Sequence, residues 1–316
     1  MKQQLSPWQL GATLYMPATR QDLLEVILTR KYPQLRSLIL CLEDSVSDAD
    51  LDFAINNLHA TLISLAKVKQ SGVYLGNSGA DEKVNTNVAM ITPLVFIRPR
   101  NIAIAEQIIA HMPLSGVSGF VLPKYTLSEV DVWWRLLENT SLYLMPTLEE
   151  RAIYDVTKME ELAVTLRDHP CYSRIIALRI GGNDLMNGLR LRRDRNYTLY
   201  EGPMGYLIKM LVSVFASKGF YLTAPVCEHI ESDFLIKELE LDLLHGLVGK
   251  TVIHPTQISV VEEAYRVPRQ SYEEAKQILS AQFAVFKVNG SMCEPVTQSQ
   301  WAADIIERER FFGIKV

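Results

Sequence analysis

Charged side chains recur where the apolar runs of this sequence end. Arg98 closes one run, Glu149 follows another, and Asp184 stands in the segment GGND (181–184) after a third. Carboxylate oxygens are ligands that Mg²⁺ prefers, and Mg²⁺ keeps several waters whose positions substrate oxygens can take. Glu149 and Asp184 are therefore the candidate ligands of a divalent metal. Such a metal acts as a Lewis acid and stabilises an enolate while a carbon–carbon bond breaks or forms.

Arginines and a further acid accompany these carboxylates. A guanidinium grips a carboxylate through two parallel hydrogen bonds, so Arg98 is the candidate clamp for a substrate carboxylate. Arg20, after the first apolar run, and Arg100, after the third, are further candidates for binding an anionic group. Asp44 follows the second run and is either the N-cap of the next helix or a group in the outer shell of the metal.

Structural roles compete with these interpretations. An acid such as Glu149 is also favoured at the start of a helix by the helix macrodipole. Asp184 could be a turn residue, but the two glycines before it let the backbone approach a site closely. Together the two acids favour the metal site.

Short apolar runs alternate with segments of helical period along the chain, eight of each in strict order. The predicted strands are 12–16, 37–42, 94–98, 119–122, 142–145, 175–180, 220–224 and 248–253. The predicted helices are 21–30, 49–69, 101–112, 126–138, 149–167, 204–218, 232–245 and 256–265. Continuous apolar strands alternating with helices are typical of a parallel sheet that is buried on both faces. Eight units predict a closed (β/α)₈ TIM barrel, whose catalytic residues lie at the carboxyl ends of the strands.

Two stretches lie outside a minimal barrel. Residues 70–92 are polar and rich in glycine and asparagine, which indicates an exposed insertion. The segment VPRQS (267–271) reads as a hinge that leads to helices at 272–287 and 297–311. We therefore predict a catalytic barrel over residues 1–266 and a C-terminal helical lid or oligomerisation arm over residues 267–316.

Composition narrows the class of protein. The chain has 316 residues, of which 48% are hydrophobic, and a net charge of −4, so it can bury a large core and has no basic field for nucleic acid or anionic membranes. No apolar run reaches the roughly 20 residues that span a bilayer, and the N-terminus lacks the apolar region of a signal peptide. The four cysteines are far apart and contain no CxxC pair, which indicates reduced thiols. These features predict a cytoplasmic protein, and the arginines described above predict a small anionic substrate.

Ordered motifs link the sequence to a known family. They are YMPATR (15–20), LEDSV (42–46), FIRPRN (96–101), VLPK (121–124), LMPTLE (144–149), GGNDL (181–185), TAPV (223–226) and GKTVIHPTQI (249–258). In these segments the sequence resembles the citrate lyase β-subunit and HpcH/HpaI aldolase superfamily. More closely, it resembles the branch called C–C bond lyase of the TIM-barrel fold, which is found in tellurium-resistance-associated biosynthetic clusters. The motifs span about residues 11–266, and the last of them is the most specific.

The resemblance implies a set of site residues. It implies Mg²⁺, or Mn²⁺ in its place, on Glu149 and Asp184, with Asp44 in the outer shell and Arg98 on the substrate carboxylate. It also implies a homo-oligomer, a trimer or larger, in which a C-terminal acid enters a neighbour's active site. Glu294, in the segment MCEP (292–295), occupies that place here and is the candidate acid/base.

The sequence departs from the family pattern where members that use CoA meet the thioester. Arg100 replaces an asparagine, and Ala224 replaces an aspartate near the end of the seventh strand. The use of a CoA thioester is therefore left open. The residues predict a Mg²⁺-dependent carbon–carbon lyase that cleaves a 3-hydroxy carboxylate or its acyl derivative. The alternatives are a Claisen-type synthase or thioesterase on the same scaffold, and a catalytically decayed binding or scaffold protein.

Overall fold

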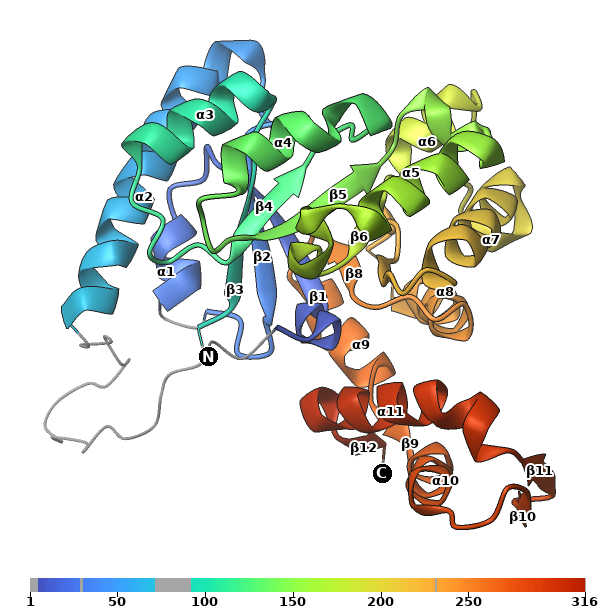
Figure 1. Cartoon of the computed structure of the whole chain (residues 1–316). Coiled ribbons are helices and arrows are strands. Elements are labelled where there is room, and N and C mark those ends of the chain that lie inside the picture. Colours follow the sequence, from blue (N-terminus) through green and yellow to red (C-terminus); the bar gives the residue numbers. More distant parts are fainter. Residues whose placement is uncertain (1–4, 29–30, 72–91, 231, 316) are drawn as a thin grey trace, which may run out of the picture.

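The computed structural model describes residues 5–28, 31–71, 92–230 and 232–315 (Figure 1). Its centre is a sheet of eight parallel strands in the order β7-β6-β5-β4-β3-β2-β1-β8. The strands are β1 (Ala12–Pro17), β2 (Ser37–Cys41), β3 (Leu94–Arg98), β4 (Gly119–Leu122), β5 (Tyr143–Leu148), β6 (Leu178–Ile180), β7 (Leu222–Thr223) and β8 (Lys250–Val252). Each predicted strand contains or overlaps one of these, so the predicted strand order is confirmed.

The first and last parts of the sheet meet and complete a barrel. The backbone N–H of Val248 donates to the carbonyl of Leu222 at 2.8 Å, and that of Ala224 donates to Gly249 at 3.0 Å. On its other side β8 pairs in parallel with β1. The chain is therefore a TIM barrel, as the sequence predicts.

Helices cover the outside of the barrel (Figure 1). They are α1 (Leu23–Leu28), α2 (Leu51–Ser71), α3 (Ile102–His111), α4 (Val130–Leu137), α5 (Val156–Asp168), α6 (Asn183–Gly188), α7 (Pro203–Ala216), α8 (Ser232–Leu244) and α9 (Thr256–Ala264). The short α6 is the only one of these that the sequence does not predict, because its two apolar residues, Leu185 and Met186, are adjacent and show no helical period. The predicted insertion 70–92 lies almost wholly outside the described residues.

The strands are buried on both faces. All five residues of β2 and all four of β4 are buried. Side chains on the outer face of the sheet meet the helices, and the inner face includes polar residues such as Thr147 and Arg179, which are 2% and 3% exposed. No helix in the described parts of the chain has the length and apolar character needed to cross a bilayer.

A C-terminal arm follows α9. It contains β9 (Val267–Pro268), α10 (Arg269–Ser280), the antiparallel pair β10 (Phe286–Val288) and β11 (Ser291–Cys293), α11 (Pro295–Phe312) and β12 (Ile314–Lys315). The segment predicted as a hinge at 267–271 is instead a strand paired with β12 and the start of α10. Figure 1 shows this arm below the barrel, at the end where the strands begin.

Candidate active site

A cavity of about 390 Å³ opens at the carboxyl ends of the strands. This is the end at which TIM-barrel enzymes carry their catalytic residues. Side chains from most strands and from the loops after them line it: Tyr15, Cys41, Glu43, Asp44, Ser45, Arg98, Thr147, Glu149, Arg179, Ile180, Gly181, Gly182, Asn183, Asp184, Val226, Glu228, Thr251 and Ile253.

Glu149 and Asp184 both lie in this cavity, at the ends of neighbouring strands. Glu149 follows β5 and is 7% exposed, and Asp184 stands in the first turn of α6 after β6. The glycine at 181 lets the two loops approach, because a Cβ there would lie 2.4 Å from Glu149 Cβ and 3.1 Å from its Oε2. The structure therefore brings together the two carboxylates that the sequence predicts as metal ligands.

A buried guanidinium fixes the orientation of Glu149. Arg98 Nη2 donates to Glu149 Oε1 at 2.9 Å, and the backbone N–H of Lys124 donates to the same oxygen at 2.8 Å. Lys124 adopts a left-handed conformation with φ of 49°, which is uncommon for a residue with a side chain. These contacts leave Oε2 of Glu149 as the oxygen that is free to face a ligand.

Glu43 is the second carboxylate bound to Arg98. Arg98 Nε donates to Glu43 Oε2 at 2.6 Å, and Nη1 donates to Thr147 Oγ1 at 3.2 Å. All three nitrogens of Arg98 are thus engaged within the protein. The sequence predicts that Arg98 grips a substrate carboxylate, whereas in the structure its guanidinium holds Glu43 and Glu149. The partner that the prediction leaves out is Glu43, and a contact of Arg98 with a substrate stays a prediction.

Burial changes the acidity of both carboxyls. It raises the pKa of Glu149 to about 7, and the nearby Arg98 limits that rise. Burial also raises the pKa of Glu43, again against the opposing effect of Arg98. A carboxyl with a pKa near neutrality binds a cation only by giving up a proton over part of the physiological range.

Asp44 lies at the rim of the cavity and is exposed. It does not cap the following helix, because Ser47 accepts a hydrogen bond from the backbone of Asp50 at that helical start. Of its two predicted roles, the N-cap is therefore wrong, and the role near a metal stays a prediction.

Arg20 and Arg100 lie outside the cavity. Arg20 pairs with Asp22, with Nη2 2.7 Å from Oδ2, and 45% of its side chain is exposed. Arg100 donates to Asp48 and to the backbone carbonyls of Leu42 and Val46. The structure gives both arginines partners within the chain and does not bring them to Glu149 and Asp184.

Glu294 is also distant from this cavity within the chain. It is the N-cap of α11, beside β11 at the tip of the C-terminal arm, and it is exposed. Only another copy of the protein could bring it to the carboxyl ends of the strands, so its role as an acid/base stays a prediction.

The most specific motif, GKTVIHPTQI (249–258), has structural roles. Lys250 Nζ lies 2.7 Å from Glu238 Oε1 and 2.8 Å from Asp242 Oδ2, and all three residues are fully buried. Gln257 accepts from the backbone of Ile253 at 2.9 Å and donates to the carbonyl of Cys227 at 3.0 Å. The motif thus ties β8 to α8 and to the loop after β7.

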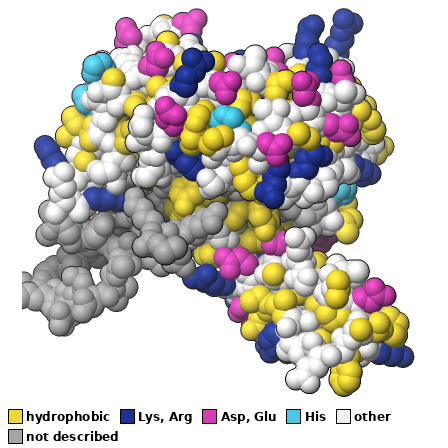
Figure 2. Space-filling view, viewed as in Figure 1, with side chains coloured by type: hydrophobic (Ala, Val, Ile, Leu, Met, Phe, Trp, Pro, Cys, Tyr) yellow, Lys and Arg dark blue, Asp and Glu magenta, His cyan; other side chains and the backbone are white. Residues whose placement is uncertain are grey.

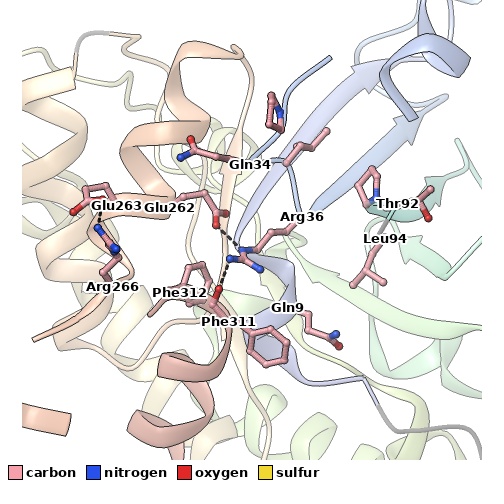
Figure 3. Close-up of a pocket in the computed structure, with 13 residues that line it drawn as sticks. Gln9, Gln34, Arg36, Thr92, Leu94, Glu262, Glu263, Arg266, Phe311 and Phe312 are labelled. Carbon is pink, nitrogen blue, oxygen red and sulfur yellow. Dashed lines mark hydrogen bonds and ion pairs between the residues drawn. The ribbon is translucent and has the colours of Figure 1, made fainter. Parts of the chain in front are cut away.

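A larger cavity, of about 580 Å³, lies at the other end of the barrel (Figure 3). Gln9, Arg36 and Leu94, which line it, stand at the starts of β1, β2 and β3. The charged groups at its centre pair with each other, because Arg36 Nε lies 2.5 Å from Glu262 Oε2. Nη2 of the same arginine donates to the carbonyl of Phe311. Size alone does not make it the active site, since the strand starts of a TIM barrel serve stability.

The donor atoms present fit a magnesium ion. Among the described residues no group of three His, Cys, Asp or Glu side chains is placed to hold a metal. Mg²⁺, however, is commonly bound by one or two carboxylates with waters and substrate oxygens in the other positions. Glu149 and Asp184 place two carboxylates in the cavity. Arg98 and the backbone N–H of Lys124 both donate to Oε1 of Glu149, so Oε2 is not occupied by these hydrogen bonds.

Solved structures with the same fold include three that match most of the chain. Protein CitE from Mycobacterium tuberculosis, in complex with magnesium, acetoacetate and coenzyme A, is 20% identical with a TM-score of 0.63 and covers 94% of this chain and 97% of its own. RipC from Yersinia pestis is 18% identical with a TM-score of 0.56, covering 82% and 96%. The M. tuberculosis citrate lyase β subunit complexed with oxaloacetate and magnesium is 18% identical with a TM-score of 0.55, covering 82% and 99%.

A comparison with curated proteins found no match. The model of one protein family, described as C–C bond lyase of the TIM-barrel fold, matches residues 4–314. That range contains the whole barrel and nearly all of the arm. The resemblance of the sequence motifs to this family and the prediction of a carbon–carbon lyase are both confirmed: the chain belongs to the family of C–C bond lyases of the TIM-barrel fold.

Proposed function

We propose that the chain is a Mg²⁺-dependent carbon–carbon lyase that cleaves a small 3-hydroxy carboxylate or its acyl derivative. Its family supports the class of reaction. The two M. tuberculosis structures contain magnesium with acetoacetate or oxaloacetate, small acids that a cavity of about 390 Å³ can hold. The observation that carries the proposal is the pairing of the buried Glu149 with Asp184 at neighbouring strand ends in that cavity.

Glu149 and Asp184 would hold the metal in this proposal. A bound Mg²⁺ supplies Lewis-acid chemistry, since it withdraws electron density from a carbonyl oxygen beside the bond that breaks. Mn²⁺ would fit the same oxygen donors. The protein's own contribution is to fix Glu149, through Arg98 and the Lys124 backbone, before any ligand arrives.

Arg98 then acts as a positioning residue. Its guanidinium lies between Glu43 and Glu149, and one cation near two buried carboxylates limits the rise of both pKa values. This keeps Glu149 available as an anion for the metal near neutral pH. The outer rim is acidic as well, because Asp44 and Glu228 line the cavity.

Cleavage also needs proton transfer. The hydroxyl proton of the substrate must leave as the bond breaks, and the carbon that receives the electron pair must gain a proton. We assign the proton transfer to Glu294 of a second copy in a homo-oligomer. Glu294 lies between two exposed apolar side chains, Met292 at 64% and Val296 at 88% exposure. Figure 2 shows apolar surface on the arm, which an oligomer would cover.

Product analysis tests the proposal. The purified protein, with Mg²⁺, is incubated with 3-hydroxy acids and with their CoA thioesters, and products are identified by mass spectrometry. We expect cleavage by the wild type and none by Asp184→Asn. Condensation or thioester hydrolysis would instead support a Claisen-type synthase or a thioesterase. A complete lack of products, together with no Mg²⁺ binding, would support the decayed binding protein.

A further inference from the structure

Arg179 is a buried cation on the inner face of the barrel that the sequence analysis does not single out. It lies in β6, pairs in register with Thr147 on β5 and Thr223 on β7, and is 3% exposed. Its side chain lines the cavity that contains Glu149 and Asp184. The signal in the sequence is a single arginine within the apolar run IIALRI (175–180).

The charge of Arg179 is not compensated within the described residues. Its Nη2 donates to the Thr251 hydroxyl, and its guanidinium carbon lies 5.2 Å from the centre of the Tyr15 ring. Its Nη1 is buried without a hydrogen-bond partner, and no carboxylate in the described parts of the chain forms an ion pair with it. The hydroxyl oxygen of Thr223, its register partner, is also buried without a partner.

Arg98 provides the contrast. Both arginines lie in the same cavity, but Arg98 has Glu43 and Glu149 as counter-ions. Burying a charged side chain costs a large free energy unless the charge is paired. An unpaired cation that lines a ligand cavity therefore indicates that the ligand supplies its counter-ion. The guanidinium geometry suits a carboxylate or a phosphate.

We propose that Arg179 binds an anionic group of the substrate at the inner end of the cavity, and thereby selects substrates with a second acid group. The inference rests on the proposed function only in taking this cavity as the substrate site. Thr147 lies in β5, Glu149 follows it two residues later just past the end of that strand, and Arg179 is level with Thr147. Arg179 therefore lies roughly 7 Å deeper than the level of Glu149. A short acid has one anionic group at the mouth and the other at Arg179.

A structural role is the competing explanation. Arg179 contacts Tyr15 of β1 and Thr251 of β8, so it could serve to tie three strands together. The two explanations differ in what they predict for stability. Removing an unpaired buried cation is neutral or stabilising, whereas removing a structural tie is destabilising.

Binding calorimetry with two pairs of acids tests the proposal. Malate differs from lactate, and 3-phosphoglycerate from glycerate, by one added carboxylate or phosphate on a 2-hydroxy acid. We expect the wild type to bind at least one of the two larger acids about tenfold or more tightly than its partner. A preference for malate identifies the bound group as a carboxylate, and a preference for 3-phosphoglycerate identifies it as a phosphate. Arg179→Met should abolish the preference and leave lactate and glycerate binding within about twofold.

Controls separate the possible outcomes. Arg192→Met removes an exposed arginine and should keep the preference. Arg179→Met should unfold at a temperature no lower than the wild type. The proposal is wrong if Arg179→Met unfolds at a lower temperature than the wild type and binds all four acids more weakly to the same extent. It is also wrong if Arg179→Met keeps the preference, or if the wild type has no preference. Should Arg179→Met not fold, Arg179→Lys retains the charge but loses the planar pair of donors, and it should lose part of the preference.

Titrations in Mg²⁺ and in EDTA separate this inference from the proposed function. The preference that depends on Arg179 should persist in EDTA. If Mg²⁺ makes no difference to the binding of lactate, the metal-dependent function fails while the role of Arg179 stands. If Mg²⁺ strengthens the binding of lactate but Arg179→Met leaves the preference unchanged, the role of Arg179 is wrong while the metal-dependent function stands.

Discussion

Arg98 Nη2 lies 2.9 Å from Oε1 of Glu149, and the two side chains are 6% and 4% exposed. This buried ion pair joins β3 to the loop after β5 and fixes one oxygen of the carboxylate proposed to bind the metal. Because Glu43 shares the same guanidinium, the arginine serves two acids at once.

The affinity for Mg²⁺ should depend on pH. Burial raises the pKa of Glu149 to about 7, so below that value the metal must displace a proton. We expect a nearly constant dissociation constant above about pH 8 and about tenfold weaker binding for each pH unit well below 7. Calorimetric titrations from about pH 5.5 to about pH 8.5 measure this. An affinity unchanged across that range would show that Glu149 does not exchange a proton for the metal.

Gly181→Ala should weaken metal binding. Its new Cβ would lie 2.4 Å from Glu149 Cβ, so Glu149 must move. We expect Mg²⁺ affinity to fall about tenfold, as for other residues that orient metal ligands. Gly182→Ala is the matched control, because its Cβ would meet Val226 Cγ1 at an ordinary 3.4 Å. Equal Mg²⁺ affinities for the two variants would contradict a role for the close approach at Gly181.

Lys250→Met should destabilise the fold. Lys250, Glu238 and Asp242 are fully buried, and loss of the lysine leaves Asp242 without its cation. Breaking a buried ion pair in this way costs about 3–5 kcal/mol, which denaturant unfolding measures. Lys237→Met, an exposed change on α8, should cost little. A Lys250→Met protein of normal stability that has lost activity would instead place Lys250 in the chemistry.

Mixing two inactive variants should restore activity if copies share their sites. Glu294→Gln removes the proposed acid on the arm, and Asp184→Asn removes a proposed metal ligand in the barrel. A mixed oligomer of the two contains some sites with both groups intact, so activity should reappear after subunit exchange. Native mass spectrometry confirms that mixing took place. Mixed oligomers without recovered activity would exclude a shared site.

Much of the barrel could be predicted from the sequence because each strand is a continuous apolar run. Glu149 and Asp184 were identifiable for the same reason, since residues after adjacent parallel strands meet at one edge. The choice between Glu43 and Asp44 could not be made, because successive residues at a strand end point to opposite sides. In the structure Glu43 points inward and is 4% exposed, whereas Asp44 is exposed.

The roles of the arginines were harder to predict. Arg20, Arg98 and Arg100 each follow or close a strand, but the sequence does not show which acids neutralise them. In the structure each has an acidic partner: Asp22, Glu43 with Glu149, and Asp48. Arg179, inside an apolar run, carried a clearer signal, because a charge in a buried strand needs a partner. Pairing across strands decides which cation remains for a ligand.

Calorimetric titration with Mg²⁺ tests the metal site between Glu149 and Asp184 most directly. Wild type is compared with Glu149→Gln and Asp184→Asn, and with Glu150→Gln as the control for the same chemical change one residue away. We predict saturable binding of one Mg²⁺ per chain to wild type and Glu150→Gln, and about tenfold or greater loss of affinity in the other two. Equal affinity in all four proteins, or no binding by the wild type, would contradict the account.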